Sequence, residues 1–145
     1  MEIKIKKERE NAVIPTYGSR GAAGADLYAA LSEPVEIAPG ETALVPSGLS
    51  MAIPDGFVGL VFARSGMATK RGIAPANKVS VIDSDYRGEL MIPLYNHSKT
   101  ATTIVPGERI AQLAIMPVMQ ATFAEADELP ETDRGTGGFG STGRW

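Results

Sequence analysis

The sequence V-S-V-I-D-S-D-Y-R-G-E, residues 79–89, joins a short β-branched run to a dense polar cluster. Its first four residues favour a β-strand, since valine and isoleucine prefer extended backbone. Asp83 and Asp85, with a tyrosine and an arginine, follow before Gly88, and apolar residues resume at 90–94. A polar cluster between two strand-like runs predicts a β-hairpin, whose rim can aim side chains at a ligand. We therefore expect any chemistry to be centred here.

Sharp turns separate short apolar runs on both sides of this sequence. Pro39-Gly40, Pro54-Asp55-Gly56 and Pro106-Gly107 combine a preset φ with a residue that tolerates positive φ. Between the turns we predict β-strands over residues 35–37, 42–45, 49–53, 58–62, 90–95, 101–105 and 110–118. This spacing predicts an all-β fold, a distorted jelly-roll or β-clip sandwich subunit, with at most one short helix within residues 65–71. Pro93 predicts that its strand lies at a sheet edge or is bulged.

Composition limits the class of protein. At 145 residues we expect one domain, and without cysteine the chain has neither a disulfide nor a thiolate zinc site. The N-terminus lacks the apolar core of a signal peptide, and no apolar run reaches the roughly 20 residues of a membrane helix. A net charge of −3 argues against nucleic-acid binding. We expect a cytoplasmic protein with no membrane or nucleic-acid partner.

The chain changes character after residue 124. Residues 125–131 are acidic with few apolar side chains, and residues 135–143 read G-T-G-G-F-G-S-T-G. We therefore divide the chain into a domain, residues 1–124, and a flexible glycine-rich C-terminal arm, residues 125–145, that a ligand or partner could hold in place. The arm contains G-x-G-x-x-G, but no strand precedes it and no helix follows, so the pattern does not indicate dinucleotide binding.

Single residues of the polar cluster leave alternatives open. Asp83 and Asp85 could hold a divalent cation as a D-x-D pair on one face of a strand, or they could cap backbone N–H groups in a turn, which the spacing alone favours. Tyr86 taken alone is more typical of a partly buried packing residue than of a ligand site. His97 is the only histidine, so a Ser-His mechanism has little to work with.

Five motifs in a fixed order carry a family resemblance over nearly the whole chain. They are A-G-A-D-L (23–27), A-R-S-G-M-A (63–68), the opening sequence extended back to Asn77, G-E-R-I-A-Q-L (107–113) and R-G-T-G-G-F-G-S-T-G (134–143). In this order they resemble the trimeric deoxyuridine triphosphate nucleotidohydrolases, or dUTPases. That family usually has proline where this chain has Ala63 and glycine where it has Ser80. If Ser80 required a positive φ, it would cost about 1 kcal/mol or more.

The resemblance implies a homotrimer with three active sites, each shared by three chains. The first, second and fourth motifs would come from one subunit, the third from another, and the arm from the remaining one. The implied reaction is Mg²⁺-assisted hydrolysis of dUTP to dUMP and pyrophosphate, which limits uracil incorporation into DNA and supplies dUMP. Mg²⁺ would be held by the triphosphate and by water rather than directly by protein ligands.

The resemblance also assigns roles to the domain's polar residues. Asp83 would be the general base that activates the attacking water, and Asp26 would either hold metal-bound water or organise the deoxyribose side of the pocket. Gln112, counted with the catalytic residues, would contact phosphate oxygens together with Arg64, Ser65 and Gly66. Asn77 and the backbone around Val81 would read the uracil edge, and Tyr86 would exclude a 2′-hydroxyl group.

In the arm, the resemblance implies that Phe139 stacks on uracil. The remaining implied substrate-binding residues of the arm are Arg134, Gly140, Ser141 and Thr142, with Arg134 and the two hydroxyl residues on the terminal phosphate. Two rivals stay open beside this interpretation. A dCTP deaminase shares the jelly roll and the trimer, but it tends to carry tryptophan near the position of Tyr86 and lacks the equivalent of Gly66. A catalytically idle binding protein of the same fold is the other.

Overall fold

Residues 1–138, the part of the chain that this computed structural model describes, contain twelve β-strands and one short helix. The strands are β1 (Lys4–Lys7), β2 (Thr16–Tyr17), β3 (Ala25–Tyr28), β4 (Val35–Ile37), β5 (Thr42–Pro46), β6 (Leu49–Ala52), β7 (Phe57–Phe62), β8 (Ile73–Pro75), β9 (Ser80–Ile82), β10 (Met91–Asn96), β11 (Thr102–Ile104) and β12 (Arg109–Pro117). The helix is η1 (Met67–Arg71), a single π-type turn.

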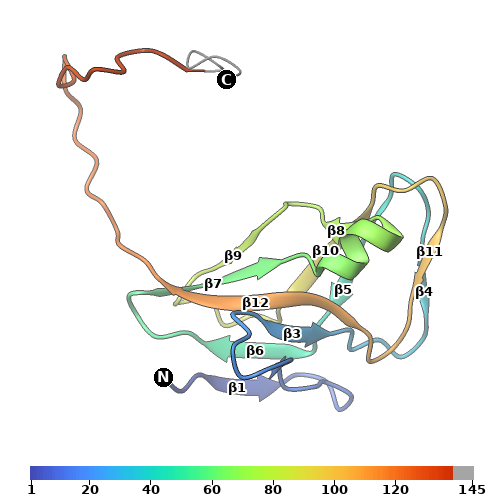
Figure 1. The fold of residues 1–145 in the computed structure, drawn as a ribbon. Coiled ribbons are helices and arrows are strands. Elements are labelled where there is room, and N and C mark those ends of the chain that lie inside the picture. Colours follow the sequence, from blue (N-terminus) through green and yellow to red (C-terminus); the bar gives the residue numbers. More distant parts are fainter. Residues whose placement is uncertain (139–145) are drawn as a thin grey trace.

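The strands form four small antiparallel sheets (Figure 1). The largest has the order β2-β3-β12-β7-β9, and the others are β5-β10-β8, β1-β6 and β11-β4. The long strand β12 runs through the middle of the largest sheet, with β3 on one side and β7 on the other. Apart from β2 and β3, the strands that pair are not consecutive in the sequence, so the chain crosses between sheets rather than folding as consecutive hairpins.

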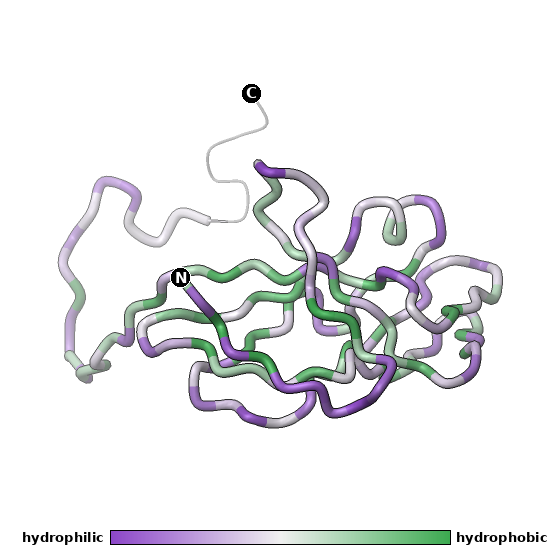
Figure 2. The backbone as a smooth tube through the Cα atoms, turned by 90° about the horizontal axis from the view of Figure 1, so that it is seen from below, coloured by the Kyte–Doolittle hydropathy of each residue, from purple (hydrophilic) through white to green (hydrophobic). Residues whose placement is uncertain are grey.

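One main hydrophobic core lies between these sheets. Five residues of this core, Leu27, Val45, Val61, Ile92 and Ile104, are fully buried, and they come from strands of three of the four sheets. Figure 2 shows the apolar segments running through the body while hydrophilic residues gather at the loops. Each such side chain contributes about 1.5–3 kcal/mol on burial. Sheets that close on one shared core are the arrangement expected of a sandwich.

The strand predictions are confirmed for eight strands, β4 to β7 and β9 to β12, with ends that differ by at most one residue. The all-β class and the short helix within residues 65–71 are confirmed as well. Sequence analysis placed no strand before residue 35, and it missed β1, β2, β3 and β8. These are two to four residues long, too short for a period-2 pattern to stand out.

Two local predictions are wrong. The polar cluster after Ile82 is not the tip of a β-hairpin, because β9 pairs with β7 whereas β10 pairs with β5 and β8. The cluster is a loop that carries the chain from one sheet to another. Pro93 does not lie on an edge strand, since β10 is the middle strand of its sheet. Its missing N–H is tolerated because the β8 ladder begins one residue later, at Leu94.

The chain leaves the body after β12 ends at Pro117 (Figure 1). The Val118 N–H donates to the Gly56 carbonyl at 2.9 Å, and residues 119–136 are exposed. The division at residue 124 and the mobility of the arm remain predictions. Within residues 1–138, none of the helices is both long enough and apolar enough to span a lipid bilayer.

Candidate active site

Three neighbouring strands bring the first, second and fourth motifs into one row. Gln112 on β12 pairs with Asp26 on β3 and with Phe62 on β7. Adjacent strands lie about 4.8 Å apart, and paired residues of antiparallel strands point to the same face. Arg64 follows β7 two residues after Phe62. The sheet therefore gathers Asp26, Gln112 and Arg64 as predicted.

Asp26 is the electrostatic centre of this row. Its Oδ1 is 2.9 Å from Nε of Arg64, and its Oδ2 is 3.2 Å from Nη1 of Arg109. The Arg64 guanidinium also donates to the Arg109 backbone carbonyl at 3.1 Å. The Asp26 side chain is only 13% exposed, so both arginines are fixed by a mostly buried anion. Each guanidinium keeps further N–H groups for another anion.

Gln112 and the second motif complete this charged row. Gln112 Nε2 donates to the Ala63 carbonyl at 2.9 Å, which links β12 to the start of the Arg64 loop. Gly24 makes room for it, because a Cβ there would lie 2.9 Å from Gln112 Oε1. Ser65 and Gly66 are exposed at the start of the helical turn that leads into η1. Backbone N–H groups at the start of a helix have no intrahelical partner and can bind an anion.

The loop after β9 holds the third motif and is braced by its own polar groups. The Tyr86 N–H donates to the Asp83 carbonyl at 3.2 Å, and the Tyr86 hydroxyl donates to the Glu89 carbonyl at 3.0 Å. The Arg87 guanidinium donates to the carbonyls of Ser84 and Tyr86 at 2.6 and 2.9 Å. Asp83 is exposed, and none of the ion pairs within residues 1–138 involves it.

Asn77 and Ser80 are joined just before this loop. The Ser80 hydroxyl lies 3.0 Å from Asn77 Nδ2 and 3.2 Å from Asn77 Oδ1. Ser80 does not have a positive φ, so the strain considered for serine at this position does not arise. The non-glycine residue with positive φ is Lys78, at 67°. The serine is accommodated in strand β9, where its hydroxyl is buried and paired.

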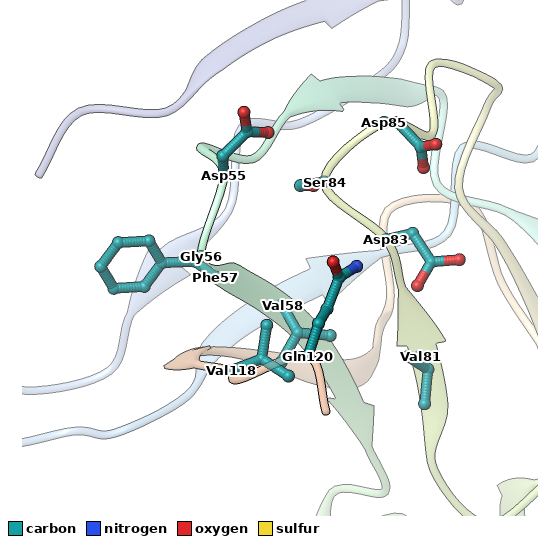
Figure 3. A pocket seen from close by; sticks show the side chains of 10 residues that line it. All are labelled: Asp55, Gly56, Phe57, Val58, Val81, Asp83, Ser84, Asp85, Val118 and Gln120. Atoms are coloured by element: carbon teal, nitrogen blue, oxygen red, sulfur yellow. The ribbon is translucent and has the colours of Figure 1, made fainter. Parts of the chain in front are cut away.

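Two pockets flank Asp83. The larger, of about 820 Å³, is bounded by the start of β7, the loop after β9 and the segment after β12 (Figure 3). It is lined by Asp55, Gly56, Phe57, Val58, Val81, Asp83, Ser84, Asp85, Val118 and Gln120. The smaller, of about 180 Å³, is lined by Val81, Ile82, Asp83, Tyr86, Glu89, Leu90 and Met91. The second pocket thus brings together Val81, Asp83 and Tyr86, three of the predicted site residues.

The Asp83 loop and the Asp26 row lie at opposite ends of strand β7. Gly59 near its start pairs with Ile82, the residue before Asp83, whereas Phe62 at its end pairs with Gln112. Gly59 and Phe62 alone are roughly 10 Å apart at 3.3 Å per residue. Asp83 lies beyond the first and Arg64 beyond the second, so a single chain keeps its two sets of site residues apart.

The arm adds little to the site of its own chain. The Arg134 Nε donates to the Gly137 carbonyl at 2.8 Å, within an exposed turn. Phe139, Gly140, Ser141 and Thr142 lie outside the described residues, and their roles stay predictions. Sequence analysis gave no role to Arg109, although it lies in the quoted fourth motif. Its pairing across the sheet, through a β-bulge near the start of β12, was not visible in the sequence.

No metal centre is assembled from protein ligands in residues 1–138, where no group of three or more histidine, aspartate or glutamate side chains converges. Asp85 does not lie on a strand with Asp83, because both are in the loop. Asp26 still fits a role behind a hydrated cation. Its Oδ1 is ion-paired with Arg64 and its Oδ2 accepts an N–H of Arg109, and each oxygen retains a lone pair for a water molecule.

Comparison with known proteins gives one consistent family. The sequence model of dUTPase matches residues 10–143. The deoxyuridine 5'-triphosphate nucleotidohydrolase of Burkholderia cenocepacia strain HI2424 is 49% identical over 145 residues, which cover 99% of this chain and 98% of that protein. The enzyme of the same name from Paraburkholderia phymatum is 48% identical with the same coverage.

Solved structures agree with this result. A mutant dUTPase of Staphylococcus bacteriophage 80alpha, with dUpNHpp, has a TM-score of 0.89 and 27% identity, and the match covers 98% of both chains. A mutant dUTPase of phage phi11 of S. aureus, in which a structural Mg(II) ion is coordinated, shares the fold with a TM-score of 0.81 at 24% identity. The jelly-roll prediction is thereby confirmed, and the chain belongs to the dUTPase family.

Proposed function

We propose that this chain hydrolyses dUTP to dUMP and pyrophosphate in active sites shared between the subunits of a homotrimer. Water attacks the α-phosphorus, the bond from that phosphorus to the bridging oxygen breaks, and pyrophosphate leaves. Such a reaction needs mainly positioning and charge stabilisation from the protein. Family membership supports the substrate, and the two separate clusters of polar residues support the sharing.

Asp83 is the proposed general base, which takes the proton of the attacking water. Its support is its exposure and its freedom from ion pairs within residues 1–138, since a carboxylate committed to an arginine would be a poor proton acceptor. A positioned general base contributes typically about 10²–10⁴-fold. The adjoining pocket with Val81 and Tyr86 offers a place for the nucleoside beside it.

Arg64 and Gln112 are proposed to bind the phosphate oxygens, with the backbone of Ser65 and Gly66. Their support is the row of side chains fixed around Asp26, which leaves guanidinium N–H groups free. Mg²⁺, when bound, would neutralise the triphosphate and would be held by its oxygens and by waters, with Asp26 accepting from those waters. Arg134, Ser141 and Thr142 of another subunit's arm would take the terminal phosphate, and Phe139 would stack on uracil.

Asn77 and the backbone around Val81 are proposed to read the uracil edge, because a mispaired buried polar group would disfavour cytosine. Tyr86 is proposed to lie against the deoxyribose and to leave no room for a 2′-hydroxyl group. Its support is the ring's fixed placement beside the smaller pocket. Val81, Asp83 and Tyr86 follow one another in β9 and its loop, so these proposals assign them, with Asn77 just before β9, to one subunit's contribution.

The single observation that carries the shared site is the separation of Asp83 and Arg64 at opposite ends of β7. One chain cannot place both beside one α-phosphate, whereas two chains side by side can. A complementation experiment tests this. Asp83→Asn and Arg64→Ala chains, each nearly inactive alone, are co-expressed with different tags, and the mixed oligomers are isolated for a pyrophosphate-release assay with dUTP.

If the two residues come from different subunits, every mixed trimer, whether 2:1 or 1:2, has both residues intact in one of its three sites, and roughly a third of the wild-type activity returns. Mixing Asp83→Asn chains with differently tagged Asp83→Asn chains is the matched control and recovers nothing. If the mixed oligomers remain as inactive as their parents, while wild-type trimers are active, the site lies within one subunit and the proposal is wrong.

A further inference from the structure

Glu89 links the substrate-facing loop to the N-terminal segment of the chain. Its carboxylate accepts two N–H groups of Arg9, Nε at 2.6 Å on Oε1 and Nη2 at 3.1 Å on Oε2. Oε1 also accepts the backbone N–H of Gly48 at 3.0 Å. This is the bidentate arginine–carboxylate geometry that combines strength with fixed orientation. Of the ion pairs within residues 1–138, only this one reaches the loop of residues 83–89.

The N-terminal side of this link is firmly attached to the body. The Glu8 N–H donates to the Gly48 carbonyl at 2.8 Å, and Ala12 is buried with Ala30 and Leu49 in a small core of its own. Gly48, with a φ of +71°, fits directly beneath this core, because a Cβ there would collide with Ala12 and Ala30. Arg9 and the Gly48 N–H therefore act from a fixed platform.

The loop side of the link leads directly to Tyr86. The Tyr86 hydroxyl donates to the backbone carbonyl of Glu89, the same residue whose side chain is bound to the platform. The ring lies against Gly88, where any Cβ would collide with it. Glu89 and Tyr86 both line the smaller pocket. The placement of the ring thus depends on where the Glu89 backbone is held.

We propose that Arg9 and Glu89 are positioning residues that set the discrimination between deoxyribose and ribose nucleotides by fixing the Tyr86 ring through the Glu89 carbonyl. The inference rests on the proposed function, in which Tyr86 faces the sugar. It adds Arg9, which lies outside the five motifs, and Glu89, the last residue of the third motif. Neutralisation by Arg9 also keeps the Glu89 carboxylate from repelling a phosphate-bearing ligand beside the pocket.

The charges of the pair agree with the geometry. The hydrogen bond from Arg9 is the main cause that lowers the pKa of Glu89 below its ordinary value, with a smaller contribution from the Gly48 N–H. The hydrogen bond to Glu89 raises the pKa of Arg9 in turn. Both groups are therefore charged and paired throughout the neutral range, which a constant positioning role requires.

The test compares kcat/KM for dUTP and for UTP in wild-type protein, Glu89→Ala, Glu89→Gln and Arg9→Met. Loosening the ring admits the 2′-hydroxyl, so we expect the dUTP-to-UTP ratio to fall about tenfold in Glu89→Ala and Arg9→Met, and less in Glu89→Gln, which can still accept one hydrogen bond. The readout is the dUTP-to-UTP ratio rather than the turnover of dUTP, because Glu89 lines the smaller pocket and its change also acts on dUTP. The double variant Arg9→Glu/Glu89→Arg restores part of the ratio by re-forming the pair.

Glu8→Gln is the matched control. Glu8 is a neighbouring acid with its own partners, Lys6 Nζ at 2.8 Å and the Ser50 hydroxyl at 2.6 Å, and it makes no hydrogen bond to the loop. Its change leaves the ratio as in wild type. Tyr86→Ala distinguishes the positioning role of Arg9 and Glu89 from the role of the Tyr86 ring itself. If Tyr86→Ala shifts the ratio but the Glu89 and Arg9 variants do not, the positioning inference is wrong while the sugar gate stands.

If Tyr86→Ala leaves the ratio unchanged, the gate itself is wrong and the inference falls with it. If wild-type protein releases no pyrophosphate from dUTP, the proposed function has failed. A fall in thermal stability with an unchanged ratio would identify the Arg9–Glu89 pair as purely structural, and it would equally overturn the inference.

Discussion

Asp26 on β3 and Asp83 just after β9 belong to one sheet, yet their surroundings are opposite. Asp26 is mostly buried, with an ion pair to Arg64 on one oxygen and a hydrogen bond from Arg109 on the other. Asp83 is exposed and has no ion pair within residues 1–138. Asp26 is already engaged by two cations, whereas Asp83 is open to a ligand from outside its own loop. The two carboxylates therefore differ in what they can contact, and the roles proposed for them differ accordingly.

Among the variants that test this difference between the two carboxylates, Asp83→Asn is expected to have the largest effect. The amide keeps the shape of the side chain but cannot take the proton of water, so kcat falls by about 10²–10⁴-fold while KM for dUTP changes little. Steady-state pyrophosphate release measures both constants. A kcat near the wild-type value would remove Asp83 from the role of base.

Asp85→Asn is the control, and it also decides whether the D-x-D pair acts as a unit. Both residues lie in the same loop and line the larger pocket, but only Asp83 lines the smaller pocket with Tyr86. We expect Asp85→Asn to change kcat by less than about threefold. Equal losses in the two variants would instead indicate a shared cation.

Removal of the arm is expected to have the next largest effect. Residues 119–136 are exposed and Arg134 contacts only its own turn within the described chain, so deletion of residues 134–145 leaves the core intact. If another subunit's arm takes the terminal phosphate, kcat/KM falls about 10²-fold with an unchanged unfolding temperature and oligomer mass. Calorimetry and light scattering supply the controls. Full activity of the shortened chain would show that the arm has no role in the reaction.

The fold was largely predictable because its signals are local. The predicted strands β4 to β7, β11 and β12 each adjoin a turn with proline and glycine that is visible in the sequence, and their apolar residues reach the core. The short N-terminal strands lack that signal: β1 pairs with β6, far along the chain, and β2, only two residues long, pairs with β3. The hairpin prediction failed for the same reason. Strand propensity identifies β9 and β10 but cannot tell that they pair with different sheets.

The candidate site was predictable as residue types in motifs, but its geometry was not. Motif order placed Asp26, Arg64 and Gln112 in one site, and the sheet gathers them. The Arg109 partner of Asp26 and the Arg9–Glu89 pair depend on contacts 83 and 80 residues apart in sequence. No spacing rule reaches that far. Such pairs become visible only when the strands are placed side by side.

A smaller effect is expected for Asp26→Asn, which tests the role of the buried carboxylate. The amide can still face Arg64 through an oxygen, but its NH₂ then faces the Arg109 guanidinium, donor against donor. We expect a loss of about 1–3 kcal/mol in the free energy of unfolding and a KM for dUTP that rises about tenfold, with kcat reduced less. Urea unfolding and steady-state kinetics measure the two effects.

The control for Asp26→Asn is Asp55→Asn in the turn before β7. Asp55 is exposed and has no ion pair within residues 1–138, so its change stays within about 0.5 kcal/mol. If Asp26→Asn proved as harmless as Asp55→Asn, the two arginines would not depend on Asp26 for their placement. If it removed kcat as completely as Asp83→Asn, the division of roles between the two carboxylates would be wrong.

The smallest effect is expected when the pH is lowered and Glu89 becomes protonated. The hydrogen bond from Arg9 lowers the pKa of Glu89 from its ordinary value of 4.5. A carboxylate whose pKa is lower in the folded state stabilises the fold fully above the unfolded-state value, and this contribution is lost as pH falls through the lower folded-state value. As the pH falls below about 4.5, the unfolding temperature of the wild-type protein therefore drops by an amount that the unfolding temperature of Glu89→Gln does not lose. We expect the two curves to differ by about 1–3 °C at pH 7 and to converge near pH 3. Parallel curves would mean that Glu89 is no better paired in the folded chain than Asp83, and that the loop is held by its backbone alone.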